Sequence, residues 1–100
     1  MIIVIARIEV DPVDLDRLRP ALDAMMRATW EESGCLSYSV AIENEAGGVI
    51  SVVERWADEA AMQEHVGSAH LAAFKRAMEG VTKFADVRAF DVIGERSFGL

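Results

Sequence analysis

The chain has 100 residues, 52% of them hydrophobic, and a formal net charge of −7. This length suits a single domain over residues 1–100. The apolar fraction exceeds what so small a monomer needs, which favours burial of apolar surface against a second copy. Phosphate backbones and anionic lipids would be repelled by the negative charge. We therefore expect neither a nucleic-acid partner nor a membrane partner.

The cysteine content and the first residues bear on localisation. Cys35 is the one cysteine, so the chain forms no internal disulfide and suits a reducing compartment. The opening MIIVIARIEV holds only a short apolar run before Arg7, which is too short for a secretion signal or a membrane span. These features predict a cytoplasmic protein.

The first predicted elements are a strand and a helix. Residues 1–10 are rich in β-branched side chains, which is typical of a strand. Asp11 and Pro12 suit the N-terminus of a helix. Apolar residues then recur every three or four positions, and we expect a kink at Pro20 and a C-terminal cap at Gly34.

A β-hairpin is predicted next. The alternation in residues 35–43 places on one face of a strand the side chains of Leu36, Tyr38, Val40 and Ile42. The sequence NEAGG at residues 44–48 predicts the turn, and residues 49–56 predict the returning strand. Because that strand is apolar on both faces until Glu54, we place it centrally in a sheet that is covered on both sides.

The last part of the chain predicts a broken helix and a final strand. Asp58 suits the cap of a first helical piece, and Gly67 and Ser68 interrupt it, with Ser68 as the cap of the second piece. Residues 85–93 predict the last strand. Residues 94–100 form a C-terminal tail for which no element is predicted.

The predicted order of elements is β-α-β-β-α-β, which is typical of the ferredoxin-like α+β fold. In that fold a four-stranded antiparallel sheet carries both helices on one face. The strands have apolar residues on both faces, so the face without helices would expose a large apolar patch. We therefore expect two sheets to pack face to face in a homodimer.

Common site motifs are absent from the sequence, including a phosphate-binding loop, a nucleophile elbow and a CxxC pair. His65 and His70 would lie about 140° apart around a continuous helix. They could share a metal ion only if the break at Gly67 redirected one of them. The sequence therefore predicts no metal site.

His65 occupies the inward face of the predicted helix, beside Met62 and Val66. One interpretation is a buried histidine whose ring is satisfied by a carbonyl or a carboxylate. The other is a neutral imidazole that faces a cavity between helix and sheet and transfers a proton. The sequence leaves both interpretations open.

Four other side chains also have a structural and a functional interpretation. Trp56, Tyr38 and Phe74 either fill the core or line a pocket for a flat ligand. Arg7 interrupts an apolar strand, and it either reaches solvent at the edge of the sheet or pairs with Glu54 on a neighbouring strand.

The segments MIIVIARIEV, GCLSYSV, VVERW, EAAMQEHVGSAHLAAF and DVRAFDV follow the order and spacing of the antibiotic biosynthesis monooxygenase (ABM) family. The chain resembles this family over nearly its whole length, from Ile2 to Ile93. The resemblance implies a dimeric α+β barrel with a pocket between sheet and helices. It also implies His65 as a base or substrate anchor. The further pocket residues that it implies are Tyr38, Trp56, His70 and Phe74.

The first function that the resemblance implies is the oxygenation of a small quinol or polyphenol by molecular oxygen, without metal, flavin or haem. Arg7 is a further candidate contact for such a substrate. Haem-degrading relatives of this fold have an asparagine at the position of Arg7 and a tryptophan at that of His65, so no haem is expected. The first alternative is an isomerase of a small phosphorylated sugar derivative, which needs a cationic pocket with Arg7, Arg55 or Arg88 pointing inward. The second alternative is a non-catalytic ligand-binding module, which a cavity filled by side chains would favour.

Overall fold

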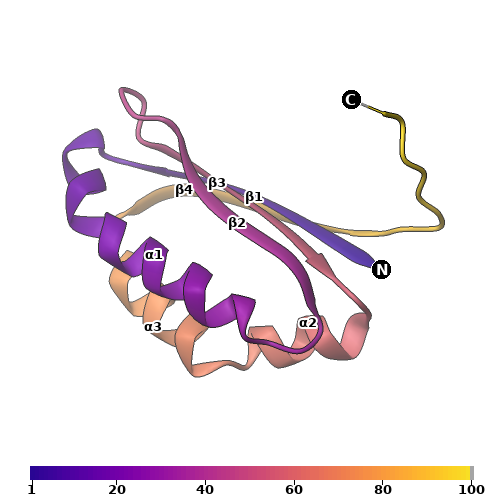
Figure 1. The fold of residues 1–100 in the computed structure, drawn as a ribbon. Helices are drawn as coiled ribbons and strands as arrows, with labels where there is room; N and C mark the ends of the chain where they lie inside the picture. The colour runs from indigo at the N-terminus through magenta and orange to yellow at the C-terminus, as the bar shows by residue number, and fades with distance from the viewer. Residues whose placement is uncertain (100) are drawn as a thin grey trace.

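The computed structural model describes residues 1–99, and it confirms the predicted α+β order with the second helix divided in two. Figure 1 shows the sheet as one layer and the helices as a second layer on one of its faces. The elements are β1 Ile2–Val10, a 3₁₀ turn Pro12–Asp14, α1 Leu15–Trp30, β2 Cys35–Asn44, β3 Val49–Trp56, α2 Glu59–Val66, α3 Ala69–Met78 and β4 Thr82–Asp91.

The four strands are antiparallel neighbours in the order β2-β3-β1-β4. Val4 of β1 lies opposite Glu54 of β3 and Ala89 of β4. Because side chains alternate along a strand, this register puts the even-numbered residues of β1 and β3 on the face that carries the helices. The core lies there, between the sheet and α1, and it includes the fully buried Ile50 and Trp56.

The helix after β1 begins as the sequence predicts and ends earlier. The Asp11 carboxylate accepts a hydrogen bond from the backbone N–H of Val13 and so caps the 3₁₀ turn before α1. The helix continues through Pro20 and ends at Trp30, so the expected cap at Gly34 is wrong. A glycine is needed at position 34 for close packing and not for a helix cap, because a Cβ atom at this position would overlap with the Cβ of Ala61. Only a glycine lets the turn approach α2 so closely.

The alternation predicted for β2 is wrong at its first residues. The pairing of β2 with β3 shifts register between Cys35 and Ser37, which leaves Leu36 as the additional residue of a β-bulge. Leu36 is therefore exposed, whereas Cys35 packs against the core. From Tyr38 onward the predicted inward face is correct, since Tyr38 is buried and Val40 packs against the core.

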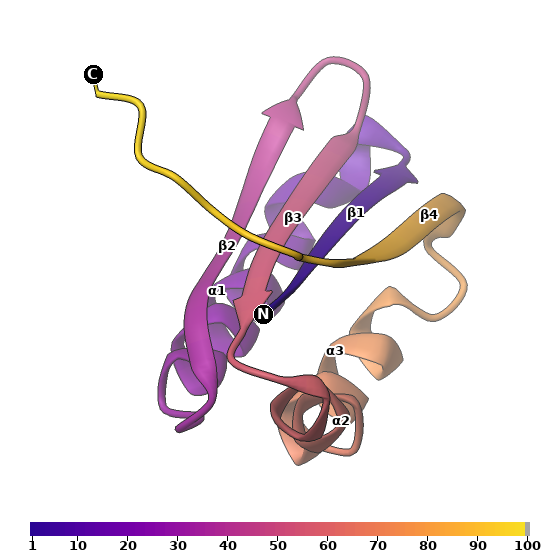
Figure 2. The same cartoon turned by 90° about the vertical axis from the view of Figure 1, so that its right-hand side faces the viewer.

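The broken helix is confirmed. Asp58 accepts a hydrogen bond from the N–H of Ala61 and caps α2, and Ser68 accepts one from the N–H of Leu71 and caps α3. Gly67 ends α2, so the two helices are separate pieces with different axes in Figure 2. The last strand, β4, begins three residues before the predicted 85–93 segment. Among residues 1–99, no helix is long and apolar enough to cross a membrane.

The face of the sheet without helices carries a band of exposed apolar side chains. Ile5 and Val53 face each other across β1 and β3, and Phe90 lies on the same face of β4. These three side chains are 45–48% exposed, which is high for large apolar residues in the middle of strands. That a second copy of the chain packs against this face stays a prediction.

Candidate active site

A cleft of about 840 Å³ lies between the helix-bearing face of the sheet and helices α2 and α3. Alternate side chains of β1, β3 and β4 form its floor, and apolar side chains of both helices, together with Lys75 and Arg76 of α3, form its wall. Its volume suits a small organic ligand. The lining residues that concern the chemistry are Tyr38, Glu54, Met62, His65, Phe74 and Val87.

His65 stands in the wall of this cleft and is almost fully buried, with 4% of its surface exposed. Its ring lies over the indole of Trp56, with the ring centroids 4.7 Å apart and the planes inclined by 33°. The ring of Tyr38 lies 5.2 Å away, centroid to centroid. Packing against these two aromatic rings therefore restricts the orientation of the imidazole, in addition to any polar contact.

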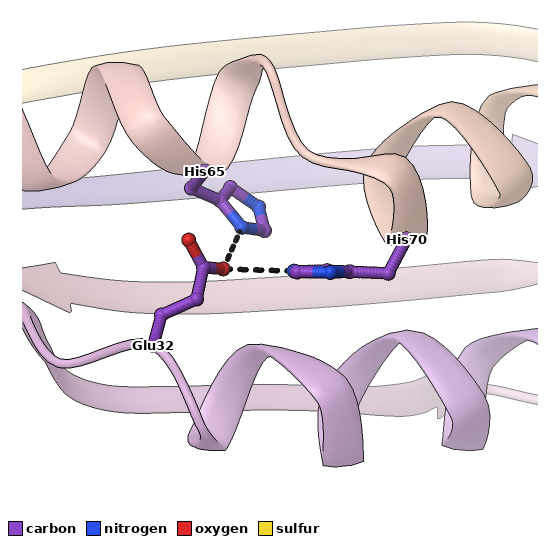
Figure 3. A group of neighbouring side chains, drawn as sticks. All are labelled: Glu32, His65 and His70. Atoms are coloured by element: carbon purple, nitrogen blue, oxygen red, sulfur yellow. Dashed lines mark hydrogen bonds and ion pairs between the residues drawn. The ribbon is translucent and has the colours of Figure 1, made fainter.

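Glu32 supplies the polar contact. One of its carboxylate oxygens, Oε2, lies 2.7 Å from Nδ1 of His65 and 2.8 Å from Nε2 of His70 (Figure 3). Glu32 comes from the turn after α1, His65 from the last turn of α2 and His70 from the first turn of α3. The break at Gly67 redirects the second histidine, so the 140° separation expected for a continuous helix does not apply.

The contact with Glu32 determines the tautomer of His65. An ionised carboxylate only accepts hydrogen bonds, so both imidazoles donate to it, and the proton of neutral His65 is on Nδ1. The other nitrogen, Nε2, then carries a free lone pair. Among the described residues, no fully buried side-chain nitrogen or oxygen lacks a hydrogen-bond partner. Since Nδ1 of His65 makes the hydrogen bond to Glu32, an unpartnered Nε2 is not fully buried, and we infer that it opens into the cleft that the residue lines.

Glu54 is the second carboxyl group at the cleft. Its Oε1 accepts a hydrogen bond of 2.9 Å from the indole N–H of Trp56. Burial raises the pKa of Glu54, while the Trp56 N–H and the charge of His65 oppose the rise and the negative charge of Glu32 adds to it. Glu54 therefore holds a proton more readily than an exposed glutamate does.

Tyr38 contributes a neutral phenol to the cleft. Burial, with the nearby charges of Glu54 and Glu32, raises the pKa of Tyr38 well above its ordinary value. Its hydroxyl donates a hydrogen bond of 3.5 Å to Sδ of Met25, which is a weak acceptor. The phenol remains protonated at physiological pH, and a stronger acceptor on a ligand could replace the sulfur.

The structure brings some of the predicted site residues together at the cleft and separates others from it. His65, Tyr38 and Phe74 line the cleft. Trp56 is fully buried behind His65 and does not line it, and His70 lies on the far side of Glu32. Trp56 contacts the cleft residues Tyr38, Glu54 and His65 from behind, and the ring of His70 lies 5.6 Å from that of His65, centroid to centroid.

Arg7 lies away from the cleft, and of its two interpretations the pairing with Glu54 is wrong, since its side chain is exposed to solvent. Arg7 follows Ala6 on β1 and so points to the open face of the sheet, whereas Glu54 is on the helix-bearing face. The guanidinium of Arg7 pairs instead with Glu43 of β2, at 2.6 Å. Both side chains are about half exposed, so the pair adds little stability.

Glu32 is the residue that the sequence analysis did not identify. The sequence indicated only that a buried His65 needs a carboxylate or carbonyl partner. The spacing of the acidic residues along the chain did not indicate which of them is that partner. The carboxylate and the two imidazoles have ligand atoms within 4.8 Å of one another, and they are the group of described residues that could hold a metal ion.

Comparison with known proteins agrees with this architecture. The Mycobacterium tuberculosis protein named "Putative monooxygenase Rv0793" is 42% identical to this chain over 67 residues, which are 67% of this chain and 65% of that protein. The chain thus aligns with somewhat less than two thirds of the length of this curated relative. The structure of Rv0793 superposes with a TM-score of 0.84 at 32% identity, over 96% of this chain and 98% of that one.

A second structural neighbour and a family model complete the comparison. A crystal structure from Deinococcus radiodurans has a TM-score of 0.88 at 23% identity, over 100% of this chain and 99% of that one, a likeness that concerns the fold alone. The model of the family described as "Antibiotic biosynthesis monooxygenase" matches residues 1–77, which include Glu32, the aromatic residues behind the cleft and both histidines. The chain belongs to the antibiotic biosynthesis monooxygenase family.

Proposed function

We propose that the chain is a monooxygenase that oxidises a small quinol or polyphenol with molecular oxygen, with His65 as the base. The observation that carries the proposal is the orientation of His65. Glu32 holds Nδ1 of His65, a residue that lines a largely apolar cleft of about 840 Å³, so the lone pair of Nε2 is left for a ligand there. A phenol bound there would place its hydroxyl against a proton acceptor.

The proposed reaction needs no redox group besides the substrate. Nε2 of His65 accepts the phenolic proton, and the electron-rich phenolate reduces O₂ while a ring carbon forms a bond to one oxygen atom. The protonated His65 returns its proton to the distal oxygen. The O–O bond then breaks as the ring C–H proton is lost, which leaves a carbonyl on the ring and releases water. One oxygen atom enters the product, the other leaves as water, and the substrate supplies the electrons.

The residues around His65 suit these steps. The apolar floor and wall exclude water from the phenolate and from the reduced oxygen, which strengthens the electrostatic contacts inside the cleft. When His65 becomes an imidazolium, the Glu32 carboxylate stabilises its charge, because Oε2 accepts the Nδ1–H. The neutral phenol of Tyr38 can donate a hydrogen bond to a bound oxygen.

The alternatives raised by the sequence receive less support. An isomerase of a phosphorylated sugar was expected to have Arg7, Arg55 or Arg88 pointing inward, yet all three lie on the open face of the sheet by their register. The cations that do line the cleft, Lys75 and Arg76, share a largely apolar lining with Glu79. A non-catalytic module was expected to have a filled cavity, whereas the cleft has room for an aromatic ring. The oxygenation therefore remains the function that the site supports best.

The test is oxygen uptake with a panel of hydroquinones and polyphenols. The variants are His65→Ala and, as a matched control on the same helix, Gln63→Ala at an exposed position. We expect uptake by the wild type with at least one quinol, a loss of about a hundred-fold in kcat in His65→Ala, and no loss in Gln63→Ala. Equal rates in His65→Ala and wild type would remove His65 from the mechanism.

We further propose that the open face of the sheet packs against the same face of a second copy. Ile5, Val53 and Phe90 form an apolar band on this face, and Arg88 and Asp86 add charges of both signs that a two-fold arrangement can pair. The cleft is on the other face of the sheet and stays accessible in such a dimer. The single thiol of Cys35 favours the cytoplasm as the location of this dimer.

A further inference from the structure

We propose that Glu32, His65 and His70 form a site for a divalent transition-metal ion, Zn²⁺ in particular, and that the bound ion removes the proton acceptor from the cleft. The binding itself is independent of the proposed oxygenation, and only the effect on turnover rests on it.

The donor atoms have the chemistry and the placement that such an ion needs. Two imidazole nitrogens and one carboxylate oxygen are a common protein ligand set for Zn²⁺. One ligand atom from each of Glu32, His65 and His70 lies within 4.8 Å of the other two, and Oε2 of Glu32 is 2.7 Å from Nδ1 of His65 and 2.8 Å from Nε2 of His70. They come from three segments whose relative positions are fixed by the fold, so binding needs no ordering of a loop.

The present distances correspond to the metal-free state, in which protons hold the three groups together. The two N–O distances are 2.7 and 2.8 Å, whereas two ligands of a tetrahedral Zn²⁺ stand about 3.3 Å apart when each is about 2.0–2.1 Å from the ion. The carboxylate would have to move away from the rings by about half an ångström. Rotation of the Glu32 side chain supplies this movement without a change in the backbone. The two imidazole nitrogens, now within 4.8 Å of each other, must also stand about 3.3 Å apart, and rotation of the partly exposed His70 side chain can bring its ring closer.

The site is accessible from solvent. The side chains of Glu32 and His70 are 15% and 23% exposed, while that of His65 is 5% exposed. An ion can therefore enter past Glu32 and His70, and a water molecule can occupy its fourth coordination position. Neither Glu32 nor His70 lines the large cleft, so the ion would sit behind His65 and not in contact with a substrate.

A metal ion on Nδ1 would reverse the protonation of His65. A neutral imidazole that coordinates through Nδ1 carries its proton on Nε2, the nitrogen that opens into the cleft. In that tautomer Nε2 donates a hydrogen bond and cannot take a proton from a phenol. Zn²⁺ would therefore inhibit an oxygenation that depends on His65, and removal of Zn²⁺ would restore it.

The composition of the chain permits a clean binding experiment. The chain contains two histidines, both in this cluster, and one cysteine. Untagged protein is titrated with Co²⁺, whose visible absorption reports its coordination, and with Zn²⁺ by calorimetry. We expect one ion per chain with the spectrum of nitrogen and oxygen ligands, and a loss of affinity of at least about ten-fold in Glu32→Ala and in His70→Ala.

The controls exclude other binding modes and unfolding. Cys35→Ser should bind as the wild type does, since a thiolate ligand would give an intense near-ultraviolet band that we do not expect. Glu31→Ala, next to Glu32 but exposed, should also bind normally. Circular dichroism shows whether each variant is folded. His70→Gln is a second variant in case His70→Ala loses binding through misfolding. Absence of saturable binding, or equal affinity in wild type and folded His70→Ala, would overturn the site.

A separate measurement tests the effect on turnover. With a quinol that the wild type oxidises, Zn²⁺ should inhibit in proportion to its occupancy, and EDTA should reverse the inhibition. Occupancy without inhibition would overturn the tautomer argument. If no quinol is oxidised, the oxygenation fails, and the binding titrations still decide whether the metal site exists.

Discussion

Glu32 places one carboxylate oxygen 2.7 Å from Nδ1 of His65, and this contact determines which nitrogen of the neutral imidazole carries the proton. The same oxygen accepts a hydrogen bond from His70, so the carboxylate is held from two sides. The aromatic ring of Trp56 fixes the imidazole plane from behind. The site therefore combines an imidazole, a carboxylate that holds it and a largely apolar cleft.

The first prediction concerns Glu32 as a positioning residue. Glu32→Gln removes the negative charge that favours the Nδ1–H tautomer of His65 and stabilises its imidazolium. We expect kcat for quinol oxidation to fall about ten- to hundred-fold with KM nearly unchanged, because Glu32 does not line the cleft. Steady-state kinetics measures this split, with Glu31→Gln as the control. A rise in KM at constant kcat would assign Glu32 a role in substrate binding.

The second prediction concerns the close approach of Gly34 to α2. In Gly34→Ala the new methyl group would overlap with the Cβ of Ala61, so α2 must move. We expect the free energy of unfolding to decrease by about 1–3 kcal/mol, the usual effect of overpacking. Denaturant titration measures it. Gly67→Ala is the matched control, because its nearest neighbour would lie 3.7 Å away, and its stability should be within about 0.5 kcal/mol of the wild type.

The third prediction is a pH dependence that arises from Glu54. Burial raises the pKa of Glu54 in the folded chain above the ordinary value of 4.5, so between these two values the folded state binds more protons than the unfolded state. The stability contributed by this group therefore falls as the pH rises above 4.5. The substitution Glu54→Gln keeps an acceptor for the Trp56 N–H but removes the group that ionises.

We thus expect Glu54→Gln to gain stability relative to the wild type as the pH increases from 4.5, and the gain to level off once the folded-state carboxyl has ionised. Unfolding free energies at a series of pH values measure the difference. Glu64→Gln, at an exposed position of α2, is the control. A difference between Glu54→Gln and wild type that stays constant with pH would contradict the shift.

The fourth prediction concerns the open face of the sheet. Val53→Asp puts a charge in the middle of the apolar band, and a face-to-face dimer would have to bury two such charges. We expect light scattering to show a dimer for the wild type and a monomer for Val53→Asp. Val13→Asp, exposed in the 3₁₀ turn, should remain a dimer. A wild type that is monomeric at every concentration tested would contradict the proposed pairing.

Local signals made most of the fold predictable from the sequence. Asp58 and Ser68 mark helix starts because their side chains bond to amides three residues ahead, a contact that depends only on nearby sequence. The inward face from Tyr38 onward follows in the same way from strand alternation. Leu36 was misplaced because a bulge changes the register by one residue, and the period-two pattern does not show where a bulge occurs.

The site was less predictable because its contacts join distant parts of the chain. His65 and Glu32 are 33 positions apart, and their contact depends on how α2 packs beside the turn after α1. The sequence left two interpretations of Arg7 open for a related reason, since the register of its strand and its face on the sheet had to be known to choose between them. Residue types identified the candidates, whereas tertiary packing determined which of them meet.

The most direct test of the central claim, that His65 acts as the base of an oxygenation in this cleft, is isotopic labelling under ¹⁸O₂. The wild type and His65→Ala are incubated with a quinol that supports oxygen uptake, and the product is analysed by mass spectrometry. We predict one labelled oxygen atom in the product of the wild type, no accumulation of peroxide, and almost no labelled product with His65→Ala. Unlabelled quinone with release of hydrogen peroxide, at equal rates in both proteins, would contradict the account.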